Sequence, residues 1–448
     1  MNEKIQIIFG LLGGLAVFIY GMNMMSECLQ KAAGDKMKSI LALLTKNPLL
    51  GVLAGALTTA VLQSSSATTV MAIGFVSAGL MNLPQAISII FGANIGTTMT
   101  AQIIAFKISD YIYVIIFIGF LISFVTKSEK VKSIGQTIFA FGLLFLGIET
   151  MGDVMKPLAS SPVFTDLIGR VAHIPVLGVA VGTFMTLVVQ SSSATIAVLQ
   201  NFASQPGPDG VTSILGLAGA IPILLGDNIG TTITALLASI GQSKDAKRTA
   251  VAHCIFNISG CFLFIWFVKP FAALIQNISP KGPEIEAISR QIANAHTVFN
   301  ITMTLIWVCL IKLMVKIVMT LIPDGKKGVE DPGSPIYLDE NIISQPAAAL
   351  QLVAKEIFRM SDQVRDILKK TIELVKNEEV KSIDGLKENG EQVERLGKCI
   401  TEYLAALFSS GLLTEQQAAQ TASLMCVLSD VERMGTLSVE MAECMLER

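Results

Sequence analysis

A six-residue stretch that occurs twice constrains the fold of this chain more than any other feature. Gln-Ser-Ser-Ser-Ala-Thr stands at residues 63–68 and again at residues 190–195. The first copy lies within residues 48–106, which carry no charge, and the second within residues 171–243, which carry two aspartates. Amide and hydroxyl groups in hydrocarbon are costly unless protein groups or a polar ligand satisfy them. The duplication favours a ligand.

The composition predicts an integral membrane protein whose natural surroundings are a lipid bilayer. Of the 448 residues, 52% are hydrophobic and 15% are charged, against roughly 25% charged residues in soluble chains. Several apolar runs reach the roughly 20 residues that span a bilayer. The net charge of -2 indicates no nucleic acid partner. Because the seven cysteines form no C-x-x-C pair, neither a disulfide nor a cysteine metal site is expected.

Each polar stretch is predicted to be the tip of a helical hairpin. Two half-helices that meet at the serines explain four consecutive polar residues in the middle of residues 48–78. A glycine-asparagine motif follows each hairpin, as Gly-Ala-Asn-Ile-Gly-Thr-Thr at residues 92–98 and Gly-Asp-Asn-Ile-Gly-Thr-Thr at residues 226–232. Glycines and an asparagine in the middle of an apolar helix predict local unwinding.

The order of these motifs indicates an internal duplication. Gly55, Thr59 and Gln63 all recur in the second half of the membrane region at one constant offset (190 − 63), and the glycine-asparagine motif recurs at a slightly larger one (226 − 92). The second offset is seven residues larger than the first, and a longer loop at 204–210 accounts for these seven residues. We therefore predict a transport domain at 1–322, with repeats at about 5–126 and 135–268 and a final helix at about 292–321.

The basic loops predict the orientation. Lysines and arginines concentrate at residues 31–46, 127–132, 244–248 and 312–327. All four loops lie on the cytoplasmic side only if both hairpins re-enter without crossing. The N-terminus is then outside, the C-terminal domain is in the cytoplasm, and the repeats have opposite topology. The predicted fold class is an all-α membrane protein with two inverted-topology repeats, each with a re-entrant helical hairpin, and a soluble C-terminal helical bundle.

The last quarter of the chain differs in character. Residues 323–346 are rich in Pro, Gly and acids and are predicted to be a linker. Residues 347–448 are dense in charge, with apolar residues at helical spacing, which predicts about three amphipathic helices. The predicted core positions of the first of these are Leu350, Val353, Ile357, Met360 and Val364.

The polar motifs can hold an anion and small cations together. Hydroxyls donate to an oxyanion or offer lone pairs to a cation, and a helix N-terminus favours an anion. Neither motif contains Lys or Arg, so sodium is the natural counter-charge for a bound dianion. Asp227 stands where the first repeat has Ala93. As an intramembrane carboxylate it is a functional candidate, either as a sodium ligand or as a proton acceptor.

The four motif copies, with Ala-His-Cys-Ile-Phe-Asn-Ile-Ser-Gly at residues 252–260, resemble the type II sodium/phosphate cotransporter family over about residues 10–321. The resemblance implies import of inorganic phosphate coupled to sodium at the membrane midplane, in a cell (inner) membrane. It implies no cofactor and no metal beyond sodium. The expected phosphate-binding residues are Gln63, Ser64, Ser65, Ser66, Gln190, Ser191, Ser192, Ser193, Thr97 and Thr231. The expected sodium-binding residues are Gln63, Thr68, Asn94, Gln190, Thr195, Asp227 and Asn228.

The C-terminal region resembles a PhoU-like helical domain, with Glu-Arg-Leu-Gly at residues 394–397 and Glu-Arg-Met-Gly at 432–435. Metal-binding versions have an Asp after that glycine, where this chain has Lys398 and Thr436. This domain is a candidate contact for a homo-oligomer or a regulatory protein.

Two alternatives to phosphate import stay open at this point. The chain could be a membrane phosphate sensor that acts through its PhoU-like tail, or a symporter of another oxyanion. No nucleophile–base pair, metal cluster or nucleotide loop stands out, so an enzyme is not expected. His253 and His296 are interpreted as interhelical hydrogen-bonding residues.

Overall fold

The computed structural model describes residues 3–33, 47–77, 80–106, 108–159, 170–171, 173–207, 209–323, 331–377 and 383–446. These residues form helices and connecting loops, with one isolated bridge between Pro206 and Ser213. Contacts divide the chain into two compact units, Met1–Ile73 with Met81–Ile322 and Gly74–Leu80 with Pro323–Arg448. Parts of two predicted basic loops, residues 34–46 and 324–330, lie outside the described residues.

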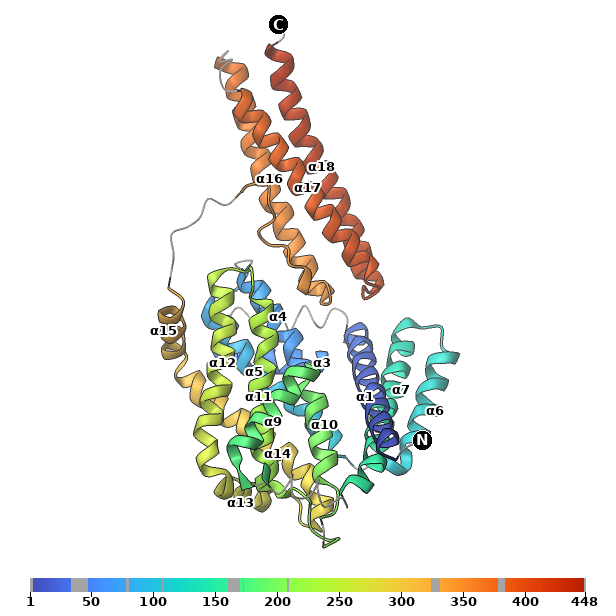
Figure 1. Cartoon of the computed structure of the whole chain (residues 1–448). Helices are drawn as coiled ribbons and strands as arrows, with labels where there is room; N and C mark the ends of the chain where they lie inside the picture. Colours follow the sequence, from blue (N-terminus) through green and yellow to red (C-terminus); the bar gives the residue numbers. More distant parts are fainter. Residues whose placement is uncertain are drawn as a thin grey trace. The chain divides into compact units, whose positions relative to one another are not determined.

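The helices of the described chain are labelled in Figure 1. Those that begin before residue 323 are α1 (Glu3–Ala33), α3 (Pro48–Leu62), α4 (Ser65–Ser77), α5 (Leu83–Ile104), η2 (Ser109–Tyr111), α6 (Ile112–Val125), α7 (Glu129–Ala159), α9 (Pro175–Val189), α10 (Ser192–Ala203), α11 (Gly216–Ala238), α12 (Lys244–Phe264), η3 (Ile265–Phe267), α13 (Val268–Ile278), α14 (Glu284–Cys309) and α15 (Ile311–Leu321). The C-terminal ones are η4 (Glu340–Ile342), α16 (Pro346–Asn377), α17 (Ile383–Ser409) and α18 (Glu415–Leu446).

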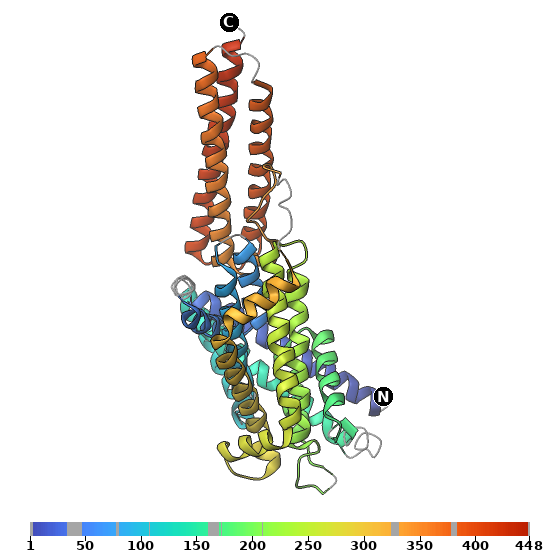
Figure 2. The same ribbon diagram turned by 90° about the vertical axis from the view of Figure 1, so that its left-hand side faces the viewer.

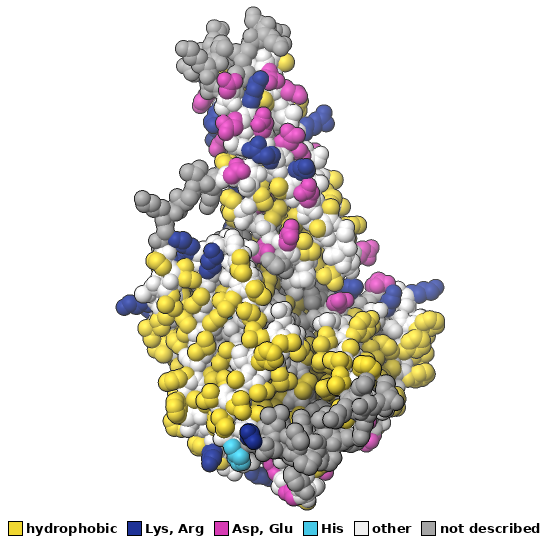
Figure 3. Space-filling model, viewed as in Figure 1, with side chains coloured by type: hydrophobic (Ala, Val, Ile, Leu, Met, Phe, Trp, Pro, Cys, Tyr) yellow, Lys and Arg dark blue, Asp and Glu magenta, His cyan; other side chains and the backbone are white. Residues whose placement is uncertain are grey.

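Within the described residues, six helical stretches are long and apolar enough to cross a bilayer, namely Gln6–Leu29, Leu83–Ile104, Glu129–Val154, Gly216–Ala238, Lys244–Ile278 and Glu284–Cys309. The seventh predicted crossing corresponds to α6, which has 14 residues and is therefore about 21 Å long. Large apolar side chains are exposed on these helices, as on α6 and α12. Figure 3 shows apolar side chains over much of one face of this unit, while Lys, Arg, Asp and Glu are frequent on the C-terminal helices. The helical architecture agrees with the predicted fold class.

The packing of α3 against α5 shows why the first hairpin must re-enter. Gly51 faces Ser88, and two turns further along α3, Thr59 faces Gly96. The two helices therefore run in the same direction, side by side. A chain that leaves the end of α3 can reach the beginning of α5 only by returning through α4. Residues 63–64 interrupt the helix where the polar motif predicted a break.

The second hairpin has the same construction, and its repeat is inverted. Gly178 faces Pro222, and two turns on, Thr186 faces Gly230, so α9 and α11 are also parallel. The first helices of the two repeats, α1 and α7, pack antiparallel, because Gly10 faces Val154 whereas Gly21 faces Leu144. Helices that occupy equivalent places in the two repeats thus point in opposite directions.

The predicted unwinding at the glycine-asparagine motifs is wrong. Both α5 and α11 run through their motifs without a break. The glycines serve close packing instead, because a Cβ at Gly92 would lie 2.0 Å from the Val52 carbonyl oxygen and one at Gly226 would lie 2.1 Å from that of Val179. The amide of Asn94 donates to the Ile90 carbonyl of its own helix at 2.8 Å, which satisfies it without unwinding.

The last membrane helices differ in their bounds from the predicted final helix at 292–321. The helix α14 begins eight residues earlier, at Glu284, and ends at Cys309. Leu310, with φ −101° and ψ 18°, separates it from α15. A short helix that was not predicted, α13, precedes α14 and buries Phe271 and Ile275.

The predicted longer loop between α10 and α11 is present and is organised by one aspartate. Asp209 accepts hydrogen bonds from the Thr212 hydroxyl at 2.6 Å and from the amides of Thr212 and Val211 at 2.9 and 3.0 Å. These bonds lower the pKa of Asp209 to about 2, and the hydrogen bond from the Thr212 hydroxyl has the largest effect. The carboxylate therefore stays charged in this exposed turn at any physiological pH.

The described part of the C-terminal unit contains three long helices, α16, α17 and α18, which lie alongside one another in Figure 1 and Figure 2. The five predicted core residues of α16 are all buried. Glu356, on the same helix, is fully buried and accepts hydrogen bonds from the amides of Ile336 and Tyr337 and from Arg359. These bonds tie the segment before α16 to the bundle.

Candidate functional site

The site begins with an unusual backbone conformation at the two hairpin tips. Gln63 and Gln190 have φ of 51° and 53° and are the non-glycine residues with positive φ in the described chain. This left-handed conformation costs energy for a residue with a Cβ and is concentrated at functional sites. Its presence at both tips shows that the duplicated motif encodes the same strained turn twice.

A new helix begins directly after each turn. The Ser64 hydroxyl oxygen accepts the Ala67 amide at 3.1 Å, and the Ser191 hydroxyl oxygen accepts the Ala194 amide at 3.2 Å. The first serine of each motif is therefore a helix N-cap. Each hairpin tip carries the partial positive charge of a helix N-terminus together with hydroxyl groups.

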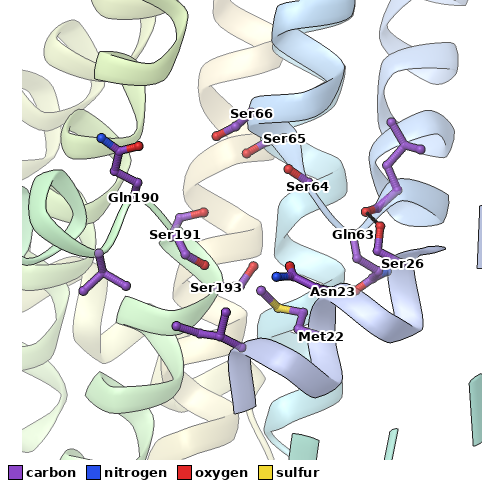
Figure 4. A pocket seen from close by; sticks show the side chains of 14 residues that line it. Met22, Asn23, Ser26, Gln63, Ser64, Ser65, Ser66, Gln190, Ser191 and Ser193 are labelled. Atoms are coloured by element: carbon purple, nitrogen blue, oxygen red, sulfur yellow. Dashed lines mark hydrogen bonds between the residues drawn. The ribbon is translucent and has the colours of Figure 1, made fainter. Parts of the chain in front are cut away.

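The two tips line one cavity of about 260 Å³. Figure 4 shows the serines of both hairpins around it, together with Met22, Asn23 and Ser26 of α1. The lining residues are Ile19, Met22, Asn23, Ser26, Leu62, Gln63, Ser64, Ser65, Ser66, Val189, Gln190, Ser191, Ser192 and Ser193. None of these fourteen side chains is ionised, so a ligand here meets hydroxyls, amides and helix N-termini.

One pair of buried threonines lies behind each hairpin tip. Thr59 Oγ1 lies 2.8 Å from Thr68 Oγ1, and Thr186 Oγ1 lies 3.0 Å from Thr195 Oγ1. All four residues are buried. The pairs are counterparts in the two repeats, since both members recur at the same offset as the hairpin glutamine.

A carboxylate distinguishes the second threonine pair from the first. Asp227 is fully buried, and its Oδ1 accepts a hydrogen bond from the Thr186 hydroxyl at 2.7 Å. Its Oδ2 has no hydrogen-bond partner among the described residues. A buried carboxylate with one neutral partner is poorly compensated, because ionised groups inside proteins are normally paired or bind a metal ion. Carboxylate and hydroxyl oxygens at this place are suitable ligands for a hard monovalent cation.

The remaining predicted ligands are more distant from the cavity. Thr97 reaches it through Ser65, at 3.4 Å between the hydroxyl oxygens. Thr231 donates to the Asp227 carbonyl of its own helix at 2.9 Å. Asn228 donates to Leu224 and faces His296 Nε2 at 3.2 Å, while Asn94 is bound to its own helix. These four residues do not line the cavity, and their roles as ligands stay predictions.

Several residues at the site were not predicted from the sequence. Thr100 donates to Gln63 Oε1 at 3.0 Å, and Thr234 donates to Ser66 Oγ at 3.1 Å. Ser26 donates to the Leu62 carbonyl and so joins α1 to the first tip. Thr100 and Thr234 are separated by the same offset as the two glycine-asparagine motifs. That offset was a signal by which they could have been found.

Comparison with known proteins decides the family. The sequence model of the Na+/Pi-cotransporter family matches residues 17–153 and, a second time, residues 151–279. The chain belongs to the Na+/Pi-cotransporter family. The two matches stand in tandem, as expected of an internal duplication, and with the six apolar helices they make this cotransporter-family member a multi-pass membrane protein. The PhoU domain model matches residues 357–445, which confirms the predicted resemblance of the C-terminal helices.

The individual relatives of this family member differ in how much of the chain they match and in the function that their names state. It is 34% identical over 263 residues to the uncharacterized protein YqeW of Bacillus subtilis (strain 168), covering 59% of this chain and 83% of that protein. It is 24% identical over 436 residues to the putative inorganic phosphate export protein YjbB of Salmonella typhimurium, and the match covers 95% of this chain and 77% of that protein. It is 33% identical over 142 residues to the human sodium-dependent phosphate transport protein 2B, and this match covers 30% of this chain and 19% of that protein. No solved structure matches the chain.

Proposed function

We propose that the membrane unit is a symporter that moves inorganic phosphate together with sodium, and that both bind between the two hairpins. The observation that carries this proposal is the cavity shared by the two hairpin tips, with Asp227 buried behind the second. In transporters built from inverted repeats, substrate sites lie at the repeat interface near the middle of the membrane. Membership of the Na+/Pi-cotransporter family supports phosphate as the anion.

The phosphate is held in this proposal by neutral donors. Ser65, Ser66, Ser192 and Ser193 supply hydroxyls, and the beginnings of α4 and α10 supply backbone amides and partial positive charge. Because no cationic side chain is among the described residues that line the cavity, the full charge of the anion must be balanced by co-bound cations. This requirement makes the coupling obligatory, since an unaccompanied dianion would be poorly solvated there.

Sodium is bound next to the second threonine pair. Asp227 Oδ2, the hydroxyl oxygens of Thr186 and Thr195, and the Gln190 side-chain oxygen are the ligands we propose. Asp227 supplies a full negative charge that the first repeat lacks, since Ala93 occupies the equivalent position. The same charge can explain coupling to the membrane potential, where each charge moved contributes about 2.3 kcal/mol per 100 mV.

The direction of transport follows from the sodium gradient in this proposal. In a symporter an inward sodium gradient drives phosphate inward; the orientation we propose has the N-terminus outside and the C-terminal unit in the cytoplasm. One observation favours the opposite direction: the relative matched over 95% of this chain is named a putative phosphate export protein. The test uses proteoliposomes that contain the full-length protein. Labelled phosphate is placed either inside or outside the vesicles, and sodium or potassium is placed on either side. The movement of the label under each gradient decides between import, export and no coupling.

We predict that Ser65→Ala and Ser192→Ala each raise the half-saturating phosphate concentration about tenfold or more, because a hydrogen bond to a charged group contributes roughly 1.5–3 kcal/mol. Initial rates of phosphate uptake over a range of phosphate concentrations measure this. Ser239→Ala is the matched control, because Ser239 is also buried but donates to Leu236 at the end of α11. Unchanged phosphate dependence in both site variants, with folded protein, contradicts the assignment of the serines.

The sensor alternative makes a different prediction for the same full-length protein. A sensor binds labelled phosphate at equilibrium but shows no sodium-driven accumulation inside vesicles. A symporter shows both. Transport of labelled sulfate at the same rate as phosphate would instead identify a general oxyanion symporter.

A further inference from the structure

A buried glutamine breaks the correspondence between the two hairpins. Gln200 lies on α10, ten residues after Gln190, and is 1% exposed. Its counterpart on α4, ten residues after Gln63, is Ile73, which is fully buried. The two half-helices therefore place an amide and a branched hydrocarbon in equivalent positions.

The side chain of Gln200 joins its hairpin to two other helices. Its Nε2 donates to the Ala101 carbonyl of α5 at 3.1 Å and to the Ser289 carbonyl of α14 at 3.0 Å. The Ala101 carbonyl also accepts the Ala105 amide at 3.2 Å, so Gln200 adds a bond to an already bonded helix. The contact reaches from the second repeat to the first, and its geometry is directional.

The equivalent contact of the first hairpin is apolar. Ile73 packs against Ala235 of α11 and against Ala246 and Ala250 of α12. Ala235 follows Ala101 at the same offset that separates the two glycine-asparagine motifs. Ser289 follows Ala246 at the same offset that separates the two Ala-His-x-x-Phe-Asn-Ile motifs, which begin at positions 252 and 295. The two contacts thus occupy the same structural place, one with hydrogen bonds and one without.

This difference matters when a hairpin moves. Alternating access in repeat transporters displaces one part against the other around the substrate site. A hydrogen bond is lost over a small displacement and leaves the buried Gln200 amide without its acceptors, whereas apolar surfaces can slide while staying in contact. We propose that Gln200 is a positioning residue that latches the second hairpin closed against α5 and α14, whereas Ile73, at the equivalent position of the first hairpin, packs through apolar contacts. For its effect on transport, the inference rests on the proposed function.

The first test is local and independent of transport. Gln200→Met keeps the shape of the side chain and removes both hydrogen bonds, and Ile73→Met is the matched control at the equivalent position. Backbone hydrogen exchange of full-length protein in detergent should be about tenfold or more faster in α10 of the Gln200 variant. Exchange in α4 of that variant and of the control should stay near that of the unmodified protein. An unchanged α10, or an equal increase in both half-helices, overturns the latch.

The second test separates a latch from a merely structural contact. Opening of the second hairpin raises the population of the state that binds ligand from its side. In oriented proteoliposomes, Gln200→Met should lower the half-saturating phosphate concentration on the side of the loop that contains Val211 and raise it on the opposite side. The orientation is read from reagent labelling of Val211→Cys in a cysteine-free background, since Val211 is 67% exposed.

Equal changes on both sides overturn the latch and indicate only weakened packing. If the unmodified protein shows no transport at all, the proposed function fails, and hydrogen exchange alone decides the latch. Gln200→Asn, which keeps the amide on a shorter stem, should fall between the unmodified protein and Gln200→Met in both measurements.

Discussion

Asp227→Asn is expected to abolish the stimulation of transport by sodium at concentrations that saturate the unmodified protein. The substitution keeps the shape of the side chain and an oxygen that can accept the Thr186 hydrogen bond, but removes the negative charge. An ion pair at about 4 Å contributes roughly 4 kcal/mol at an effective dielectric constant of 20. The half-saturating sodium concentration should therefore rise by about a hundredfold or more, as measured by phosphate uptake over a range of sodium concentrations.

The same variant should respond differently to heat. Without sodium, an unpaired buried carboxylate destabilises the fold, so Asp227→Asn should unfold at a higher temperature than the unmodified protein. Sodium should raise the unfolding temperature of the unmodified protein and not that of the variant. Asp209→Asn is the control, because Asp209 lies in an exposed turn outside the cavity. Sodium dependence that survives in the Asp227 variant would remove this residue from the coupling site.

Gly182→Ala is expected to destabilise the membrane unit by about 1–3 kcal/mol, although alanine is ordinarily the better residue in a helix by roughly 1 kcal/mol. A Cβ at Gly182 would lie 1.9 Å from the Ile223 carbonyl oxygen and 3.0 Å from the Asp227 amide nitrogen. Neither atom belongs to a flexible side chain, so α9 and α11 must move apart. Thermal unfolding in detergent measures the loss.

Gly13→Ala is the matched control, because a Cβ at Gly13 meets no atom within 4 Å. It should leave the stability unchanged or raise it slightly through the helix propensity of alanine. Gly55→Ala should behave like Gly182→Ala, since its Cβ would lie 2.1 Å from the Ile89 carbonyl oxygen. An unfolding temperature for Gly182→Ala equal to that of Gly13→Ala would show that the helix contact is not tight.

The two repeats share most features of the site but are not identical in their buried residues. The hairpins share their serines, their strained glutamine turns and their threonine pairs. The repeats differ at several buried positions, and at two of these the second repeat has Asp227 and Gln200 where the first has Ala93 and Ile73. The duplication supplies two similar hairpin tips, and in our proposals these two positions assign the cation and the latch to the second repeat.

The local sequence was sufficient for the features that depend on neighbouring residues. Four polar residues inside an apolar run predicted the interruption after Leu62 and after Val189, because hydrocarbon does not solvate them. Apolar spacing in α16 predicted its buried face, and matched offsets predicted two repeats. Each of these signals lies within a few turns of one helix or in a comparison of the chain with itself.

Only the tertiary structure decided which distant segments meet. The glycines of the glycine-asparagine motifs predicted unwinding, yet they permit the close approach of α3 and α9. The contributions of Asn23 and Ser26 of α1 to the cavity, and the bonds of Gln200 to α5 and α14, also depend on helices remote in sequence. The physical reason is that polarity and helix propensity are properties of a local segment. Whether a glycine unwinds a helix or packs it, and which atoms a buried amide reaches, depends on the distance and direction of a neighbouring helix.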